Sequence, residues 1–477
     1  MPFPDAVALY VKRCPGVSVN RYIGRLPNSQ VVTPSAHIQI QLPKVDAMDT
    51  RSAQILADVS TASSTGSFVL PRYGMQMLME SSVLICGGRT IGGQSNQYQN
   101  IWNHIKQEYT AGCQDQPKMS IFGGGGDVPP LGNTATTTGT FDLNGTYTPP
   151  TLTTYATPAW QGYSQTRPLQ PGQLNTLAYD TSSGTPYYSA GQPQVVEVFN
   201  ETLESIQPEF MPTIMMQNLY LDIGFGAANM LIGPATGTTV TQPSYQIQNI
   251  ALQCTTYDLG QAFRDFHISY VNQGNLLEMP FKSVQAWPGP LNSVMDTQLN
   301  FTCGTQSLDM LVACFLDGTP LNTYRNWGPV VKPSNTSKYF TLGKGTGVRH
   351  MNWVINGQNN PQFQVTPKAA YGQTSNDLGL SACGHGCYKN LNNFNAYLQN
   401  WFVWAYNTSL PFHESMQRAI SGLDTVNQNA QLSLVVTSDP TQTALGIEAS
   451  YSNIPLVFIV CTSSLMVGQG GQVQVMP

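Results

Sequence analysis

The sequence predicts an all-β chain built as two tandem antiparallel sandwiches, with long inter-strand loops and a few short helices. Three observations carry this prediction. Apolar and polar residues alternate with period two along many segments, as they do in strands that bury one face. Segments with helical spacing are few. The 477 residues exceed what one hydrophobic core normally serves, so two domains are expected.

The period-two segments define strands with one buried face. Glutamine or asparagine fills many of the outward positions between the apolar residues. The residues expected to face inward are Ile38, Ile40, Leu42, Met75, Met77, Met79, Met351, Trp353, Ile355, Leu432, Leu434, Val473 and Val475. Two further segments, 307–316 and 455–461, are apolar on both faces. Such strands are expected inside a sandwich or under a neighbouring layer.

Two segments require a break in the alternation. Tyr245 and Ile247 share one parity, whereas Ile250 and Leu252 take the other, so a β-bulge is expected near Gln248–Asn249. Farther on, residues 355–365 predict a strand end, a Gly-Gln-Asn-Asn turn and a new strand. Pro361 is expected to open that strand, because the first residue need not donate to the ladder, with Phe363 and Val365 facing inward.

Three segments have helical character. Ile101, Ile105 and Tyr109 are four residues apart, and Gly112 follows as a helix stop. A second helix is expected from the spacing of apolar residues within 388–402, although its asparagines are weak helix formers. A short helical turn is expected within 414–423.

The chain divides into an N-terminal arm (1–34), a first sandwich (35–272) and a second sandwich (273–477), with the boundary at the polar break 271–274. The first sandwich includes a long stretch, about 113–193, that is either disordered or a large elaborated loop. Its aromatic residues favour an ordered outer loop, because disordered segments are poor in them. Those that we expect to pack in the loop, against its copies, are Tyr147, Tyr155, Trp160, Tyr163, Tyr187 and Tyr188.

The composition favours a protein that associates with itself. Charged residues make up only 10% of the chain and the net charge is −5. Interface cores are depleted of Lys, Glu and Asp, whereas enzymes of ionic metabolites rarely have so few charges. The charge also predicts no general attraction to nucleic acid. The nine cysteines form no disulfide framework, and we expect reduced thiols and intracellular synthesis. No secretory signal or membrane-spanning segment is expected.

The motifs that could carry chemistry are weak. The run Gly123–Gly126 lacks the lysine of a phosphate loop, and two prolines follow it, so it is expected to open the long loop. Cys383, His385 and Cys387 could ligate zinc, but a structural site needs four ligands, so a loop is the preferred interpretation. No catalytic residues and no cofactor are expected.

The N-terminal arm is mildly basic. Lys12, Arg13, Arg21 and Arg25 are opposed only by Asp5. Two interpretations stay open: a solvated terminus, or an arm that reaches a neighbouring subunit, an anionic membrane or genome phosphates. The interleaved aromatic and basic residues of single-strand binding proteins are absent from this segment.

Long segments of the chain resemble a known family. Residues 245–267, 276–287 and 299–318 are similar to the end of the first roll and the start of the second in double jelly-roll major capsid proteins of icosahedral double-stranded DNA viruses. Residues 351–365 and 454–477 are similar to later strands of the second roll. The members that the chain most resembles are those of virophages, polinton-like viruses and relatives of giant viruses.

The resemblance implies two tandem eight-stranded antiparallel jelly rolls and a pseudo-hexagonal homotrimer that tiles an icosahedral shell. It also implies neighbouring trimers, penton and minor capsid proteins and an internal membrane as partners, with no sequence-specific nucleic acid. The arm would then contact partners on the inner side. The chain would be assembled inside the host cell and reside in the virion capsid. Two alternatives stay open: a trimeric viral spike or receptor-binding β protein, and a carbohydrate-active β-sandwich enzyme.

Overall fold

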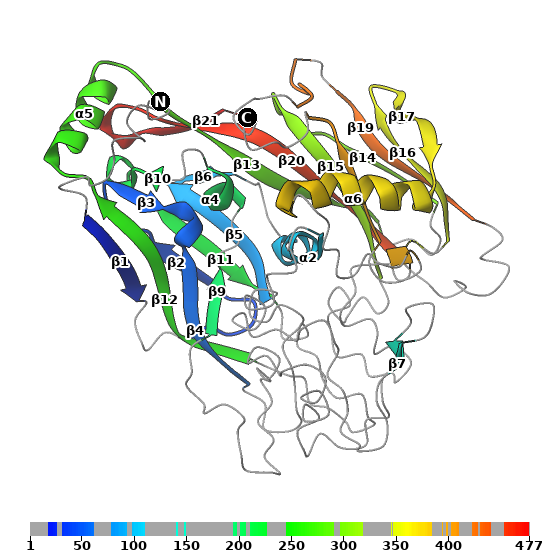
Figure 1. Ribbon diagram of the computed structural model, residues 1–477, viewed down its shortest axis with the longest axis horizontal. Coiled ribbons are helices and arrows are strands. Elements are labelled where there is room, and N and C mark those ends of the chain that lie inside the picture. The colour runs from blue at the N-terminus through cyan, green and yellow to red at the C-terminus, as the bar shows by residue number, and fades with distance from the viewer. Residues whose placement is uncertain are drawn as a thin grey trace, which may run out of the picture.

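The structure is a computed structural model, and it describes two β-sandwiches joined by a helix (Figure 1). The residues described are 18–25, 31–61, 78–92, 98–109, 140–141, 147–148, 194–197, 201–206, 210–226, 245–290, 296–317, 345, 347–383, 394, 397–398, 402–409, 422–427, 430–439 and 453–476. All structural statements below concern these residues.

The first sandwich consists of two antiparallel sheets. Sheet A has the order β1-β12-β4-β9, with two short strands, β3 and β10, beside its end. Sheet B has the order β2-β11-β5-β6. The strands of sheet A are β1 (Ser18–Arg25), β3 (Ala47–Asp49), β4 (Gln54–Thr61), β9 (Gln194–Glu197), β10 (Phe210–Met211) and β12 (Tyr245–Asp258). Those of sheet B are β2 (His37–Gln41), β5 (Met79–Cys86), β6 (Arg89–Ile91) and β11 (Tyr220–Phe225).

The second sandwich repeats this plan. Sheet C has the order β13-β20-β15-β18, with β21 beside β20, and sheet D has the order β14-β19-β16-β17. The strands of sheet C are β13 (Leu277–Pro288), β15 (Leu308–Asp317), β18 (Val403–Asn407), β20 (Asn453–Val467) and β21 (Val473–Met476). Those of sheet D are β14 (Thr297–Phe301), β16 (Val348–Ile355), β17 (Gln358–Val365) and β19 (Leu432–Ser438).

Both sandwiches have the same topology. If the eight principal strands of each are counted along the chain, one sheet has the order 1-8-3-6 and its partner 2-7-4-5 in both cases. Two sheets of four strands connected in this way form a jelly roll. The fold class predicted from the sequence is therefore confirmed. In this scheme β1 is the first strand of the first roll, as β13 is of the second.

Short helical elements connect or cover the strands. They are η1 (Thr50–Ser52), α2 (Gln99–Tyr109), α4 (Glu201–Ser205), η5 (Thr213–Met215), α5 (Gln261–Asn272), α6 (Pro367–Cys383) and η10 (Gln469–Gly471). The expected helix around Ile101 and Ile105 is confirmed as α2. Of the segment 388–402, residues 394 and 397–398 are described as helical and 402 as non-helical, and the segment 414–423 lies largely outside the described residues. Of the long loop, the strands β7 (Thr140–Phe141) and β8 (Tyr147–Thr148) are described.

Most of the expected inward residues are buried, including Ile38, Ile40, Trp353 and Leu434. The bulge in β12 is also confirmed. The pairing with β4 shifts between Gln248 and Ala251, and Asn249 takes a positive φ of 54°. One extra residue at this point lets β12 keep its apolar side chains toward the core on both sides of the bulge.

The expectation for β17 was partly wrong. A two-residue turn, Asn356–Gly357, leads into β17, so Pro361 lies inside the strand and does not open it. Val365 is buried as expected, but Phe363 is 56% exposed. The reason is a shift in pairing between Met351 and Trp353, which leaves several β17 residues unpaired in a bulge. The Asn352 side chain donates hydrogen bonds to carbonyl groups of this bulge and holds Phe363 outside the core.

The two rolls share side chains across their boundary. Ile101, Trp102 and Ile105 of α2, from the first half of the chain, belong to the hydrophobic core of the second roll. In return, Met279 and Phe281 of β13 belong to the core of the first roll, together with the far ends of β20 and β21. Figure 1 shows these three strands running from the second roll across the end of the first. Each roll therefore completes the core of the other.

Candidate assembly surfaces

The outer face of sheet A exposes apolar side chains of β1 beside neutral polar ones. Ile55 and Leu252 face the core, whereas the alternate residues Gln54 and Gln253 face outward around a shallow pocket of about 380 Å³. On β1, Val19 is 62% exposed.

Ile23, on the same face of β1, is 48% exposed. Among the described residues, no α-helix packs extensively on β1, β4, β9 or β12.

The corresponding face of sheet C is covered. In β20, Cys461 contacts Cys303, which follows a strand of sheet D, so the odd-numbered residues face the inside of the sandwich. Phe458 has the opposite parity and packs on Trp102 of α2, with ring centroids 5.3 Å apart. Helix α4 packs on β13 of the same sheet. The second roll thus has its outer face buried by helices of the first roll.

Sheets A and C have the same strand order, but in the part of the chain that the structure describes only sheet C has its outer face covered by helices, so the outer face of sheet A is left free for a partner. α2 also contacts β5 of sheet B, so the order across the molecule is sheet A, sheet B, α2, sheet C and sheet D. The outermost faces are therefore those of sheets A and D. The outer face of sheet D carries neutral side chains at Gln298 and Asn300 of β14, which are exposed.

Helix α5 forms a second exposed surface at the junction of the rolls. Its inner side packs through Val271, which is buried. Its outer side exposes apolar rings, with Phe266 58% exposed and stacked on Tyr270 at a centroid distance of 6.3 Å. Ile268 is also exposed, but it lies on the other side of the helix and lines a pocket there.

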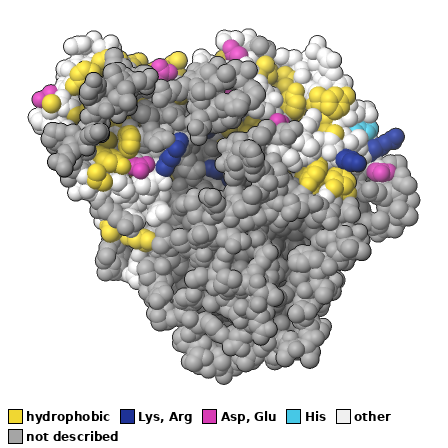
Figure 2. Space-filling model, in the orientation of Figure 1, with side chains coloured by type: hydrophobic (Ala, Val, Ile, Leu, Met, Phe, Trp, Pro, Cys, Tyr) yellow, Lys and Arg dark blue, Asp and Glu magenta, His cyan; other side chains and the backbone are white. Residues whose placement is uncertain are grey.

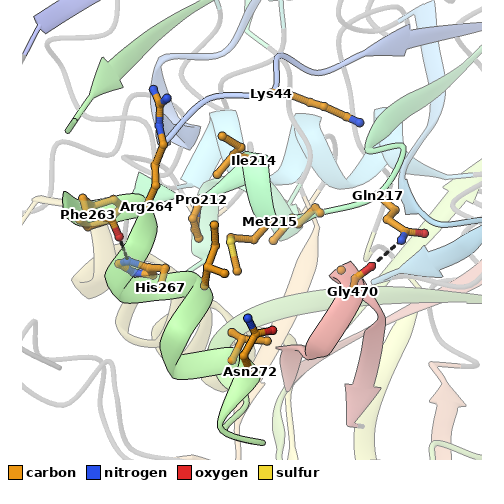
Figure 3. A pocket seen from close by; sticks show the side chains of 14 residues that line it. Lys44, Pro212, Ile214, Met215, Gln217, Phe263, Arg264, His267, Asn272 and Gly470 are labelled. Atoms are coloured by element: carbon orange, nitrogen blue, oxygen red, sulfur yellow. Dashed lines mark hydrogen bonds between the residues drawn. The ribbon is translucent and has the colours of Figure 1, made fainter. Parts of the chain in front are cut away.

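A pocket of about 360 Å³ lies between α5, the segment around η5 and η10 (Figure 3). Its walls include Ile214 and Met215, with the exposed Lys44 at its edge. His267 Nδ1 lies 3.0 Å from the Phe263 carbonyl oxygen and is held by that hydrogen bond. These groups offer a largely apolar pocket with two cationic side chains at its wall, Lys44 and Arg264, of which Arg264 is paired with Asp46.

A buried carboxylate anchors α5 to the first roll. The Asp46 side chain is fully buried and accepts hydrogen bonds from Arg264 Nε at 2.5 Å and from Leu259 N at 2.9 Å. Arg264 also lies 3.2 Å from Asp258. Burial by itself raises the pKa of Asp46, but the hydrogen bonds from Arg264 and Leu259 outweigh it and bring the pKa below its ordinary value.

Acid is therefore expected to weaken this anchor. Because the pKa of Asp46 is lower in the folded chain than in the unfolded one, its contribution is complete above the ordinary aspartate range and is lost as the pH falls through the folded pKa. The difference in unfolding free energy between wild type and Asp46→Asn should be constant above about pH 5 and shrink below it. Guanidinium unfolding at several pH values measures this difference. If the difference in unfolding free energy between the two proteins does not change with pH, the ionisation of Asp46 does not stabilise the fold.

The described surface carries few charges. Figure 2 shows only scattered lysine, arginine, aspartate and glutamate side chains on the face that it presents. Within the described ranges, no three His, Cys, Asp or Glu side chains lie together in a way that could hold a metal ion. No helix of this part of the chain has the length and apolar character needed to cross a membrane.

The residues nominated from the sequence are only partly described. Arg21 and Arg25 lie on β1, opposite Thr255 and Ala251 of β12. Tyr147 lies on β8, which pairs with β7. Cys383 is the last residue of α6. The others lie outside the described residues: Lys12, Arg13, Tyr155, Trp160, Tyr163, Tyr187, Tyr188, His385 and Cys387.

Sequence reasoning missed α5 and α6. The sequence contains a signal for α6, because Thr366 precedes Pro367, a pair that suits a helix N-cap and first turn. In the structure, Thr366 Oγ1 accepts a hydrogen bond from Ala369 N. The signal for α5 is the four-residue spacing of Phe266 and Tyr270, but its apolar residues lie on both sides of the helix and give no clear amphipathic pattern.

Comparison with known proteins shows similarity in structure and not in sequence. No protein-family model matches the chain, and no curated protein sequence matches it. PBCV-1 VP54, in a crystal structure fitted into a cryo-EM reconstruction of the virophage Sputnik, matches with a TM-score of 0.54 and 12% identity, over 97% of each chain. The Faustovirus major capsid protein matches with a TM-score of 0.56 and 10% identity, over 96% of this chain and 92% of its own. The chain therefore has the double jelly-roll fold of viral major capsid proteins.

Proposed function

We propose that the chain is a major capsid protein that assembles into a pseudo-hexagonal homotrimer and tiles an icosahedral virus shell. The observation that carries the proposal is the shared double jelly-roll fold, which extends over nearly the whole of this chain and of PBCV-1 VP54. The match covers both rolls and the helix between them, so it supports the same use of the whole chain. The proposal assigns the chain no catalytic reaction and no cofactor.

The uncovered outer face of sheet A supports association with a second copy. Within one chain, the second roll buries its equivalent face under helices of the first roll. If the same arrangement continues from chain to chain, sheet A of one copy meets the sheet D side of the next. Such a head-to-tail contact forms a closed ring when the rotation between copies closes, and three copies supply six rolls. Sheet A exposes Val19 and Ile23, and sheet D exposes Gln298 and Asn300; these neutral side chains suit a buried interface.

The remaining contacts follow from this arrangement. The segment 113–193, with its tyrosines and Trp160, would contact its copies around the trimer axis on the outer face. Lys12 and Arg13 of the arm, together with Arg21 and Arg25 of β1, would contact partners on the inner side. Those partners would be neighbouring trimers, penton and minor capsid proteins and an internal membrane, with no sequence-specific nucleic acid. The chain would reside in the virion capsid after assembly inside the host cell.

The oligomeric state tests the proposal directly. The purified full-length chain is expected to have three times the mass of one chain by light scattering, and a pseudo-hexagonal outline in negative stain. Ile23→Glu places a charge on the outer face of sheet A, where burial would cost several kcal/mol, and is expected to shift the protein toward monomer. Phe266→Glu, at a similarly exposed position on α5, is the matched control and should leave the trimer intact.

Other outcomes would point elsewhere. A stable monomer that cleaves a polysaccharide would overturn the capsid proposal in favour of an enzyme. An elongated trimer that binds a cell-surface ligand would favour a spike. A trimer that resists Ile23→Glu, with unchanged circular dichroism, would keep the capsid role but reject sheet A as the interface.

A further inference from the structure

Two cysteines meet between the sheets of the second roll. Cys303 lies just after β14 of sheet D, and Cys461 lies in the middle of β20 of sheet C. Their sulfur atoms are 3.5 Å apart, and both residues are buried. Cys86, Cys254 and Cys314 are also buried, but among the cysteines whose side chains are described this is the contact shown between two thiols.

The surroundings hold the pair in place. Cys461 pairs through its backbone with Ser283 and Leu308 on the two neighbouring strands. On the other side, Thr425 Oγ1 donates a hydrogen bond to the Cys303 carbonyl oxygen at 2.5 Å. Cys461 is thus fixed within sheet C and Cys303 by the segment around Thr425, so the approach of the two sulfurs follows from how these parts pack. A bond between them requires the two sulfurs to approach from 3.5 Å to about 2.05 Å.

The two thiols are not equivalent. The hydrogen bond with Cys461 lowers the pKa of the Cys303 thiol, whereas the same contact and burial raise the pKa of the Cys461 thiol. Cys303 is therefore the sulfur that ionises first. A thiolate is the form that reacts with oxidants, so Cys303 is the first to be oxidised and Cys461 the thiol that resolves it.

We infer that Cys303 and Cys461 are a site of covalent modification, where a peroxide converts two buried thiols into a disulfide that joins the two sheets of the second roll. The Cys303 thiolate attacks the peroxide, giving a sulfenic acid and releasing hydroxide. The Cys461 sulfur then attacks the Cys303 sulfur, and the sulfenic oxygen leaves as water with the Cys461 proton. The peroxide is reduced and both sulfurs are oxidised.

The bond would stabilise the chain once it has folded. Cys303 and Cys461 are 158 residues apart, so a disulfide closes a long loop and removes much freedom from the unfolded chain. It also joins sheet C to sheet D at the core that the first roll completes through α2. The chain would then fold with both thiols reduced, and an oxidant would afterwards make the folded chain more stable against unfolding. This inference holds whether or not the chain forms a shell.

Peptide mapping of the full-length protein tests the inference. The folded protein is treated with hydrogen peroxide, or kept in a thiol reductant, then alkylated and digested without reduction. The expected result is a linked peptide pair containing Cys303 and Cys461 in the oxidised sample only, with a mass lower by two hydrogen atoms. The thermal midpoint of the oxidised protein should be higher by about 5–10 °C. Recovery of unlinked, alkylatable Cys303 and Cys461 after oxidation would overturn the inference.

Cysteine variants distinguish the effect of this disulfide from the effect of oxidation at other residues. Cys303→Ala should abolish the rise in thermal midpoint, whereas Cys314→Ala, which removes another buried thiol of sheet C, should retain it. If Cys303→Ala does not fold, the peptide map of the wild-type chain still decides the question. A rise in midpoint that persists in a folded Cys303→Ala protein would assign the effect to a different cysteine.

Discussion

Trp102→Ala is expected to destabilise the second roll, although Trp102 belongs to the first half of the chain. Its side chain is buried in the second core against Phe458, and its removal leaves a cavity between α2 and sheet C. Deleting a buried tryptophan side chain typically costs about 3–5 kcal/mol of unfolding free energy. Denaturation in guanidinium followed by far-UV circular dichroism measures the loss.

The same variant tests whether the rolls unfold together. Hydrogen exchange read by mass spectrometry follows β11 in the first core and β20 in the second separately. In the wild type, the two strands should open with similar free energies. In Trp102→Ala, β20 should exchange faster than β11.

Trp287→Ala is the matched control, because this half-buried tryptophan packs on the same core from β13. It should cost clearly less unfolding free energy than Trp102→Ala. Equal exchange of β11 and β20 in Trp102→Ala, with wild-type stability, would show that α2 does not connect the rolls.

Asp309→Ala is expected to have an effect of similar size for an electrostatic reason. Asp309 Oδ2 lies 2.5 Å from Lys282 Nζ and accepts a hydrogen bond from Thr462 Oγ1 at 2.6 Å. Its second oxygen accepts a hydrogen bond from Ser307 at 2.8 Å. Both charged side chains are largely buried. Removing one partner leaves the other charge without compensation, which typically costs about 3–5 kcal/mol.

Removing both charges distinguishes the effect of an unpaired charge from the effect of lost packing or hydrogen bonds. The double variant Lys282→Met with Asp309→Leu keeps similar volumes and buries no charge, so it should recover most of the stability that Asp309→Ala loses. Guanidinium unfolding of wild type, single variant and double variant measures this recovery. If the double variant is as unstable as Asp309→Ala, the loss comes from packing or from the Ser307 and Thr462 hydroxyl groups, and not from the unpaired lysine.

Several elements could be predicted because their signals are local. The parity change between Ile247 and Ile250 located the bulge of β12, since each strand residue must point either to the core or away from it. The spacing of Ile101 and Ile105 located α2. Phe363 could not be predicted in the same way, because its exposure depends on a bulge that Asn352 of the neighbouring strand stabilises.

The location of the candidate assembly surfaces was harder to predict from the sequence. The low charge indicated a chain that contacts its own copies, but it did not indicate which face does so. The outer face of sheet A became a candidate only when the two rolls could be compared and sheet C was found covered by α2. The pair Cys303 and Cys461 also escaped notice, because the two cysteines are far apart in the chain and each looks like an ordinary buried residue.

The sequence by itself determined that the chain is all-β, that it has two halves with similar plans and that its surface carries little charge. These properties follow from composition and from period-two alternation, which depend on neighbouring residues alone. Only the tertiary structure decided which core α2 completes, which sheet is left uncovered and which thiols meet. Each of these depends on residues that are distant in the chain, and their approach is decided by the packing of whole sheets.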